Sequence, residues 1–463
     1  MRRPGSAGLV WSVYGAAGAL LAMLALLRWS GALLSGGPVL YGEGAVAHAA
    51  ALTRTLDTYR DAGGASFTAA NYPPLYFIAA AFGDPFVAGR LVSIAATLAV
   101  AGSIAWRGWI GGRRDRQVAA VIAVGWLALA PVSIWGPALK PDLVALALTV
   151  GAVLSLERGR ARLSAGLIML AILAKPTAVI VAVALLVWLL IADRVLLRRW
   201  SIAMAVAAAA AVLGLAPFGY GGFLLHVVVW NALSWSAEQA ALLLFLGLLF
   251  FAALIGGAVV TRASRGPIAA YLAAGVMIAI LGGREGATIN YLLDLSAAAS
   301  LALVTVVPSI RHRPHYPAAA LVNLIVAALV VDPLGVIPGR TATTGAWGDP
   351  ARVAAVRTAL AADRSVLAED SGLLVATGHE LVVDDLFLWS RLAARGAIDP
   401  VPLLESVRAA RFTAILSEVD LARLSDAPGY ERARWDPALV QAVELRYRLV
   451  SRLAGGVFVY RPR

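Results

Sequence analysis

The sequence of 463 residues contains no cysteine, few charged residues and only two lysines. The lack of cysteine excludes disulfide scaffolds and thiolate metal sites. Charged residues make up 14% of the chain, whereas an average soluble domain is about one-quarter charged. Hydrophobic residues make up 60%, and long apolar runs recur along the chain. This composition excludes a soluble globular enzyme and a disordered protein, and it predicts a membrane protein.

Eleven apolar runs predict about eleven transmembrane helices. The basic N-terminus leads into the first run without a clear cleavage site, so we expect a retained helix and not a signal peptide. Several runs are shorter than the ~17 residues that cross a bilayer, so they must tilt or line a cavity. The runs lie near residues 9–27, 84–105, 117–135, 142–156, 163–174, 176–192, 201–217, 239–260, 267–281, 291–308 and 318–334.

The distribution of arginine predicts the orientation of these helices. Residues 1–340 carry a net charge of +12, whereas residues 341–463 are neutral. With eleven spans, the arginine-rich loops all fall on the side of the N-terminus, which the positive-inside rule places in the cytoplasm. Since the basic residues occupy short inner loops, nucleic-acid binding is disfavoured. We therefore expect a multi-pass protein of the cytoplasmic (inner) membrane, with the C-terminus outside.

The chain divides into two predicted domains, residues 1–335 and 341–463. The first contains the transmembrane helices and a first outer loop over residues 28–83. The second has a soluble composition and predicts a small α/β extracytoplasmic domain. Its expected strands are 365–368, 381–383, 412–417, 447–453 and 456–462, and its expected helices are 351–362, 385–396, 400–410 and 436–445.

The first outer loop supplies the best candidate for a catalytic residue. Glu43 is the first acidic residue of the chain and lies between two glycines. A carboxylate near the membrane surface is suited to act as a general base toward a hydroxyl acceptor. The alternative is a surface charge favoured by a helix dipole. Tyr72 lies in the same loop, in the motif NYPPLYF, and is expected to line a substrate cavity.

The two lysines predict an anion site. Lys140 and Lys175 each precede a proline at the outer end of a span, in a chain whose other basic residues are all arginine. Two ammonium groups at this level suit the phosphate of a lipid headgroup. The alternative is that each lysine simply extends toward the membrane surface. Asp142 is expected in the cavity, either paired with Lys140, which we favour, or bound to a divalent metal.

A polar outer turn, GGREGATINYLLDL, continues the expected cavity. Arg284 is a candidate for a third phosphate-binding cation. Asn290 and Asp294 are four residues apart and share a helix face, and Asp294 lies within an apolar run, so it should face the cavity. Tyr291 is expected beside them. The alternative is a capped helix start with one paired aspartate.

The order of these motifs resembles that of a known family. An acidic residue after the first span, YPPLYF, GRL, KPD, KPT and GATINYLLDL follow one another over residues 10–310. The pattern resembles GT-C glycosyltransferases, specifically bacterial relatives of dolichyl-phosphate-mannose protein mannosyltransferases and lipid A aminoarabinose transferases. Many of these have an aspartate or two adjacent acids where this sequence has Glu43.

The resemblance implies a polyprenyl-phosphate-linked sugar as donor. The acceptor would be a cell-envelope glycan, lipid or protein that enters from the outer face. Glu43 would take the place of the acidic catalytic residue of the first outer loop, as general base. Lys140, Lys175 and Arg284 would hold the donor phosphate. No cofactor is required by the sequence, although a divalent metal is compatible with it.

Two other functions remain open at this point. A transporter or flippase of lipid or polysaccharide would place charges near the bilayer midplane and would show an inverted repeat, which we do not find. A non-catalytic membrane scaffold would present the C-terminal domain to a partner, and it would tolerate replacement of Glu43 and both lysines.

Overall fold

The computed structural model describes residues 6–60, 64–110, 112–260, 266–331 and 348–463, and the chain forms two compact units. The helical unit comprises Met1–Ser30, Leu91–Gly214 and Ser234–Ala346. The mixed unit comprises Gly31–Arg90, Leu215–Leu233 and Trp347–Arg463. The mixed unit therefore combines much of the predicted first loop with the C-terminal segment. The predicted boundary between residues 335 and 341 lies outside the described residues.

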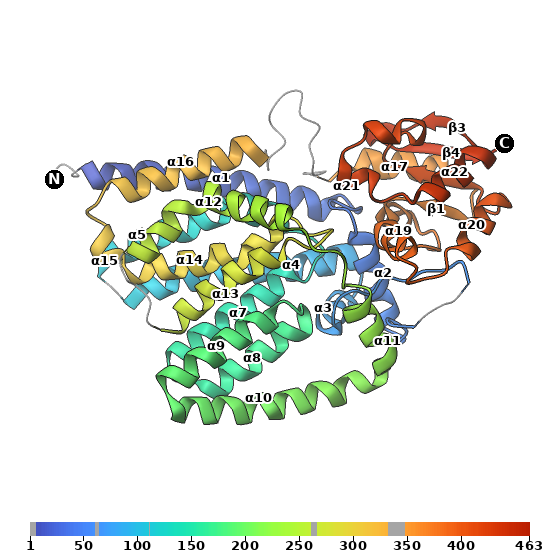
Figure 1. Cartoon of the computed structure of the whole chain (residues 1–463). Helices are drawn as coiled ribbons and strands as arrows, with labels where there is room; N and C mark the ends of the chain where they lie inside the picture. Colours follow the sequence, from blue (N-terminus) through green and yellow to red (C-terminus); the bar gives the residue numbers. More distant parts are fainter. Residues whose placement is uncertain (1–5, 61–63, 111, 261–265, 332–347) are drawn as a thin grey trace. The chain divides into compact units, whose positions relative to one another are not determined.

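The predicted apolar runs are mostly helical in their described residues (Figure 1). Within the helical unit, α7 packs against α8, α13 against α14, and α12 against α16. The apolar runs correspond to α1 (Ser6–Leu34), α4 (Pro85–Arg107), α5 (Arg113–Leu127) with α6 (Ala130–Trp135), α7 (Asp142–Glu157), α8 (Ala161–Ala174), α9 (Ala178–Ala192), α10 (Arg194–Leu215), α12 (Ala237–Val260), α13 (Pro267–Leu281), α14 (Leu293–Thr305) and α16 (His315–Val331).

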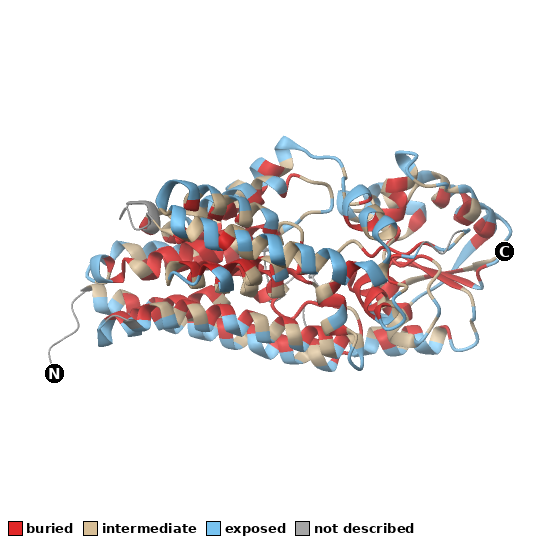
Figure 2. Cartoon of the chain, turned by 90° about the horizontal axis from the view of Figure 1, so that it is seen from below, coloured by how far each residue is buried: buried red, intermediate tan, exposed pale blue. Residues whose placement is uncertain are grey.

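The helices carry many exposed residues (Figure 2), and these include large apolar ones such as Leu213 of α10 and Phe245 of α12. Such surfaces are stable in lipid and costly in water. Among the described residues, four helices are long and apolar enough to cross a bilayer: Ala7–Leu34, Pro85–Arg107, Arg194–Phe218 and Ala237–Gly257. The chain is thus a multi-pass membrane protein, whereas the count of eleven crossings stays a prediction.

Helix α12 contains a break that a side chain of α16 compensates. Phe251 has non-helical backbone angles (φ −147°, ψ 27°), which interrupts the hydrogen bonding of the helix. Asn323 donates to Leu249 O at 2.7 Å and accepts from Ala253 N at 3.0 Å. The amide side chain therefore replaces backbone hydrogen bonds that would otherwise be missing in an apolar environment.

The mixed unit is built around a four-stranded sheet with the order β1-β2-β4-β3. Strands β1 (Val366–Ala368) and β2 (Ala414–Ser417) are parallel, and β4 (Phe458–Pro462) is antiparallel to both β2 and β3 (Tyr447–Arg452). The first two strands are buried throughout, which explains their continuous apolar sequences. Helices cover both faces of this small mixed sheet.

Two groups of helices cover the two faces of this sheet. Ile415 points into a core shared with α19 (Leu386–Ala394), α20 (Val401–Arg408) and α22 (Pro437–Arg446). Leu416 points into a core shared with α17 (Pro350–Ala359) and α18 (Ser371–Thr377). The predicted strand 381–383 forms an isolated parallel bridge, between Val383 and Phe67. The same unit contains α2 (Glu43–Thr53), α3 (Pro74–Ala80) and α11 (Tyr220–Leu224), and α2 packs against α3 and α18.

Candidate functional site

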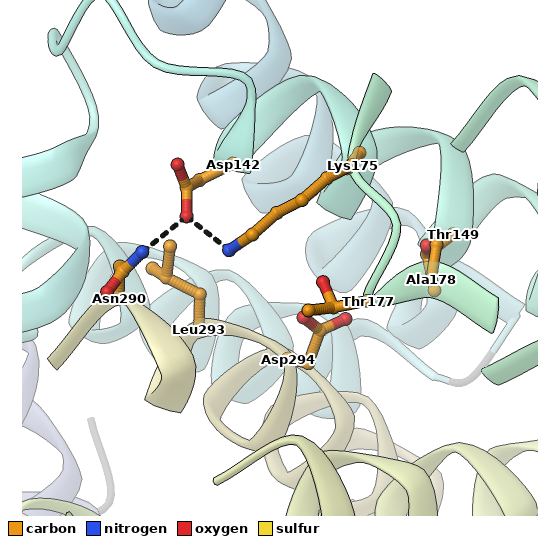
Figure 3. Close-up of a pocket in the computed structure, with 9 residues that line it drawn as sticks. Asp142, Thr149, Lys175, Thr177, Ala178, Asn290, Leu293 and Asp294 are labelled. Atoms are coloured by element: carbon orange, nitrogen blue, oxygen red, sulfur yellow. Dashed lines mark hydrogen bonds and ion pairs between the residues drawn. The ribbon is translucent and has the colours of Figure 1, made fainter. Parts of the chain in front are cut away.

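A small polar pocket lies within the helical unit, where three apolar segments begin or end (Figure 3). Asp142 is the first residue of α7, directly after Pro141. Lys175 ends α8 in an extended conformation because the following Pro176 disfavours a helical residue before it. The pocket is lined by Asp142, Ala145, Thr149, Lys175, Thr177, Ala178, Asn290, Leu293 and Asp294. Proline thus places polar side chains among apolar helices.

Asp142 and Lys175 form a buried ion pair in this pocket. Lys175 Nζ lies 2.6 Å from Asp142 Oδ1, and Asn290 Nδ2 donates to the same oxygen at 2.7 Å (Figure 3). The ammonium group also lies 4.8 Å from the centre of the Tyr291 ring, a cation–π contact. The sequence favoured Lys140 as the partner of Asp142. That prediction was wrong, because Asp142 pairs with Lys175.

The pocket contains two carboxyl groups and one ammonium group. The second carboxyl group is that of Asp294, which lies in the same pocket as Asp142 and Lys175. Asp294 accepts a hydrogen bond from Tyr271 at 3.0 Å. The second oxygen of Asp142, Oδ2, is buried and finds no hydrogen-bond partner among the described residues. The ammonium of Lys175 is therefore already balanced by the Asp142 carboxylate.

Five predicted site residues do not line this pocket: Lys140, Arg284, Tyr72, Tyr291 and Glu43. Lys140 lies in the turn before α7, where its carbonyl accepts from Ser93 at 3.2 Å. The Arg284 carbonyl accepts from Gln239 at 3.0 Å, in another turn of the helical unit. Tyr72 belongs to the mixed unit, and its ring lies 6.4 Å from that of Phe77. The pocket thus brings together Asp142, Lys175, Asn290 and Asp294, with Tyr291 beside Lys175.

Glu43 lies in the mixed unit and is fully buried. It begins α2 directly after Gly42, whose φ of 76° is a left-handed conformation that favours glycine. Glu43 Oε2 accepts from Val39 N at 2.8 Å and from Arg90 Nη2 at 2.7 Å. Asp84 does not pair with Arg90; it accepts from Val87 N at the start of α4.

Sequence reasoning missed a second pair on α2. His48 Nδ1 lies 2.9 Å from Asp384 Oδ2, and Asp384 Oδ1 accepts from Ala69 N at 2.7 Å. Burial raises the pKa of Asp384, and the hydrogen bonds from His48 and Ala69 oppose that rise. The pair joins residues 336 positions apart, so no local pattern could have revealed it.

A buried charge network fills the region beside β1 and β2. Arg434 pairs with Glu369 and Glu418, and Arg352 pairs with Glu418 and lies 3.8 Å from Asp370. Three carboxyl groups thus face two guanidinium groups. Burial and the neighbouring Glu418 raise the pKa of Asp370 to about 7. The side chain of Asp370 also caps α18, where it accepts from Gly372 N.

No metal site is evident in the part of the chain that the structure describes, which contains no group of three or more His, Cys, Asp or Glu side chains that could hold a metal ion.

Comparison with known proteins identifies the fold. No family model matches the chain, and no curated protein matches it in sequence. ArnT from Cupriavidus metallidurans bound to undecaprenyl phosphate aligns over 95% of this chain and 97% of its own, with 14% identity and a TM-score of 0.57. Its apo form gives 13% identity and a TM-score of 0.53, over the same shares of both chains.

An archaeal enzyme shows the same likeness. The apo oligosaccharyltransferase from Archaeoglobus fulgidus aligns over 98% of this chain and 74% of its own, with 11% identity and a TM-score of 0.52. The structural alignments establish a common fold. The low sequence identities leave the specific activity open. The chain has the fold of the GT-C membrane glycosyltransferases over nearly its whole length.

Proposed function

We propose that this protein is a membrane glycosyltransferase that moves a sugar from a polyprenyl-phosphate donor to a cell-envelope acceptor at the outer face of the cytoplasmic membrane. The observation that carries the proposal is the fold shared over nearly the full length with ArnT, which was crystallised with undecaprenyl phosphate. Low identity gives no support for a particular sugar or acceptor.

In this proposal Lys175 binds the donor phosphate. Its ion pair with Asp142 stabilises the Lys175 ammonium among apolar helices until the phosphate binds. Lys175 then moves from Asp142 to the phosphate, and Asn290 keeps its hydrogen bond to Asp142. Lys140 and Arg284 are proposed as further cations for the phosphate. Asp294, Tyr291 and Tyr72 are proposed to contact the rest of the donor or the acceptor.

Glu43 is proposed as the general base. Its carboxylate takes the proton of an acceptor hydroxyl while that oxygen attacks the anomeric carbon of the sugar. The bond from the anomeric carbon to the phosphate oxygen breaks, and polyprenyl phosphate leaves with the bonding electrons. The cations that bind the phosphate offset the negative charge that develops on this leaving group. Arg90 keeps the Glu43 carboxylate in place before the reaction.

The test is release of polyprenyl phosphate from labelled lipid-linked sugars, in membranes from a host that lacks the native protein. A panel of donors with different sugars is needed, because the sugar is unknown. We expect release with at least one donor, and little release with a Glu43→Gln variant at equal expression. If no donor releases polyprenyl phosphate while the protein is folded and inserted, the scaffold alternative replaces this proposal.

A further inference from the structure

The position of the Glu43 carboxylate depends on a tight turn. Glu43 N donates to Leu40 O at 3.3 Å, and Gly42 adopts its left-handed conformation between them. Glu43 Oε2 also accepts from Val39 N, in the same turn, at 2.8 Å. The carboxylate therefore moves with this turn, and a residue that fixes the turn also fixes the carboxylate.

Tyr41 lies inside the turn and is held by the C-terminal segment. Its hydroxyl donates to Asp385 Oδ1 at 3.2 Å and accepts from Phe387 N at 2.9 Å. The centre of its ring lies 4.0 Å from the guanidinium carbon of Arg434. A planar cation over an aromatic face and two hydrogen bonds define both the direction and the depth of the ring.

Arg434 is itself immobilised. Its guanidinium donates to Glu369 at 2.9 Å and to Glu418, and its carbonyl accepts from Ser390 at 2.9 Å. Only 8% of Arg434 is exposed. A buried and doubly paired guanidinium has few alternative positions, so it offers Tyr41 a rigid surface.

Two further contacts hold α2 against the same segment. A Cβ atom on Gly44 would lie 2.1 Å from Gly372 N, so the two backbones are in direct contact. One turn later His48 binds the buried Asp384. The helix that begins with Glu43 is therefore attached to the C-terminal segment at its start and near its middle.

We propose that Tyr41 and Arg434 are positioning residues for Glu43, and that the C-terminal segment is thereby part of the catalytic apparatus. The inference rests on the proposed function, in which Glu43 is the general base. Tyr41 and Arg434 touch neither donor nor acceptor in this scheme. They act by keeping the carboxylate where it can take the proton of the acceptor.

A double-mutant cycle tests this role. Tyr41→Phe removes the hydroxyl contacts and keeps the ring against Arg434, whereas Tyr41→Leu removes both. We expect kcat to fall about fivefold for the Phe variant, which loses both hydrogen bonds of the hydroxyl, and up to ~10²-fold for the Leu variant. The KM for the donor should stay unchanged. In a Glu43→Gln background, neither substitution should lower kcat further, because the base that Tyr41 positions is gone.

Tyr430 provides a matched control. Its ring also faces Arg434, at 5.7 Å, but it is 53% exposed and lies outside the turn. Tyr430→Leu should therefore leave kcat near the wild-type value. All variants are compared as full-length protein, with size-exclusion profiles and unfolding temperatures in detergent, so that a misfolded Leu variant is recognised and the Phe variant decides.

The possible results separate the inference from the proposed function. Release of polyprenyl phosphate by the wild-type protein supports the proposed function, whatever the activity of the Tyr41 variants. If the losses from Tyr41 and Glu43 substitutions multiply, or if Tyr430→Leu loses as much activity as Tyr41→Leu, the positioning role is refuted. Full activity of Glu43→Gln refutes the base assignment and the inference together.

Discussion

Replacement of Lys175 by methionine should separate its structural role from donor binding. Methionine has a similar length and no charge, so Asp142 would remain buried, at 4% exposure, without its ion-pair partner. Asn290 alone would then bond to Asp142 Oδ1. Removal of one partner of a buried ion pair typically costs about 3–5 kcal/mol. We expect the free energy of unfolding of Lys175→Met to fall by that amount.

Addition of Asp142→Asn to the same variant should restore most of this stability, because no unpaired carboxylate is left. Binding of polyprenyl phosphate should not recover, since the phosphate still lacks the lysine. Unfolding of the full chain by SDS in mixed micelles measures the first effect, and equilibrium binding of labelled polyprenyl phosphate measures the second. Wild-type stability of Lys175→Met would show that the ion pair contributes little. Wild-type binding by the double variant would exclude Lys175 as a phosphate ligand.

Three further predictions concern other sites. Glu43→Gln should lower turnover by about 10²–10⁴-fold with donor binding kept, because it removes the base; wild-type release of polyprenyl phosphate would move this role to another acid of the loop, such as Asp57. Asn323→Leu should cost about 1–3 kcal/mol in SDS unfolding, because the broken backbone of α12 loses its partners; an unchanged free energy would contradict the account of that break. The pKa of Asp370 lies at about 7, above its ordinary value of 3.8, so the folded state favours the protonated carboxyl group. The stability that this protonated form contributes is complete below pH about 4 and is lost as the pH rises to about 7. Asp370→Asn keeps the cap of α18 and removes the charge, so its unfolding temperature in detergent should fall less than that of wild type between pH 4 and pH 8; equal falls would contradict the prediction.

Much of the fold could be predicted because it depends on local patterns. Apolar length identifies helices such as α1 and α4, and alternating or continuous apolar residues identify β1, β2, β3 and β4. The break in α12 carries no proline and depends on Asn323, which is 70 residues away from Ala253. The grouping of residues 31–90 with the C-terminal segment likewise depends on contacts between distant parts of the chain.

Four of the residues that line the pocket, Asp142, Lys175, Asn290 and Asp294, could be named from the sequence, but their pairing could not. Charged residues in apolar sequence, such as Lys175 and Asp294, stand out because burial of a charge is costly. Their partners are set by the fold: Lys175 meets Asp142 across 33 residues, and Arg90 meets Glu43 across 47. Periodicity identifies neighbours within one helix and gives no information on such long-range pairs.

The central claim is that this protein transfers a sugar and releases polyprenyl phosphate, and the stoichiometry of the two products tests it most directly. Purified full-length protein in vesicles would receive a donor labelled in both the sugar and the lipid, together with an envelope extract as acceptor. The account predicts one polyprenyl phosphate released for each sugar that becomes bound to acceptor. Movement of the intact donor across the vesicle membrane, with sugar and lipid still joined, would contradict it and would favour a flippase.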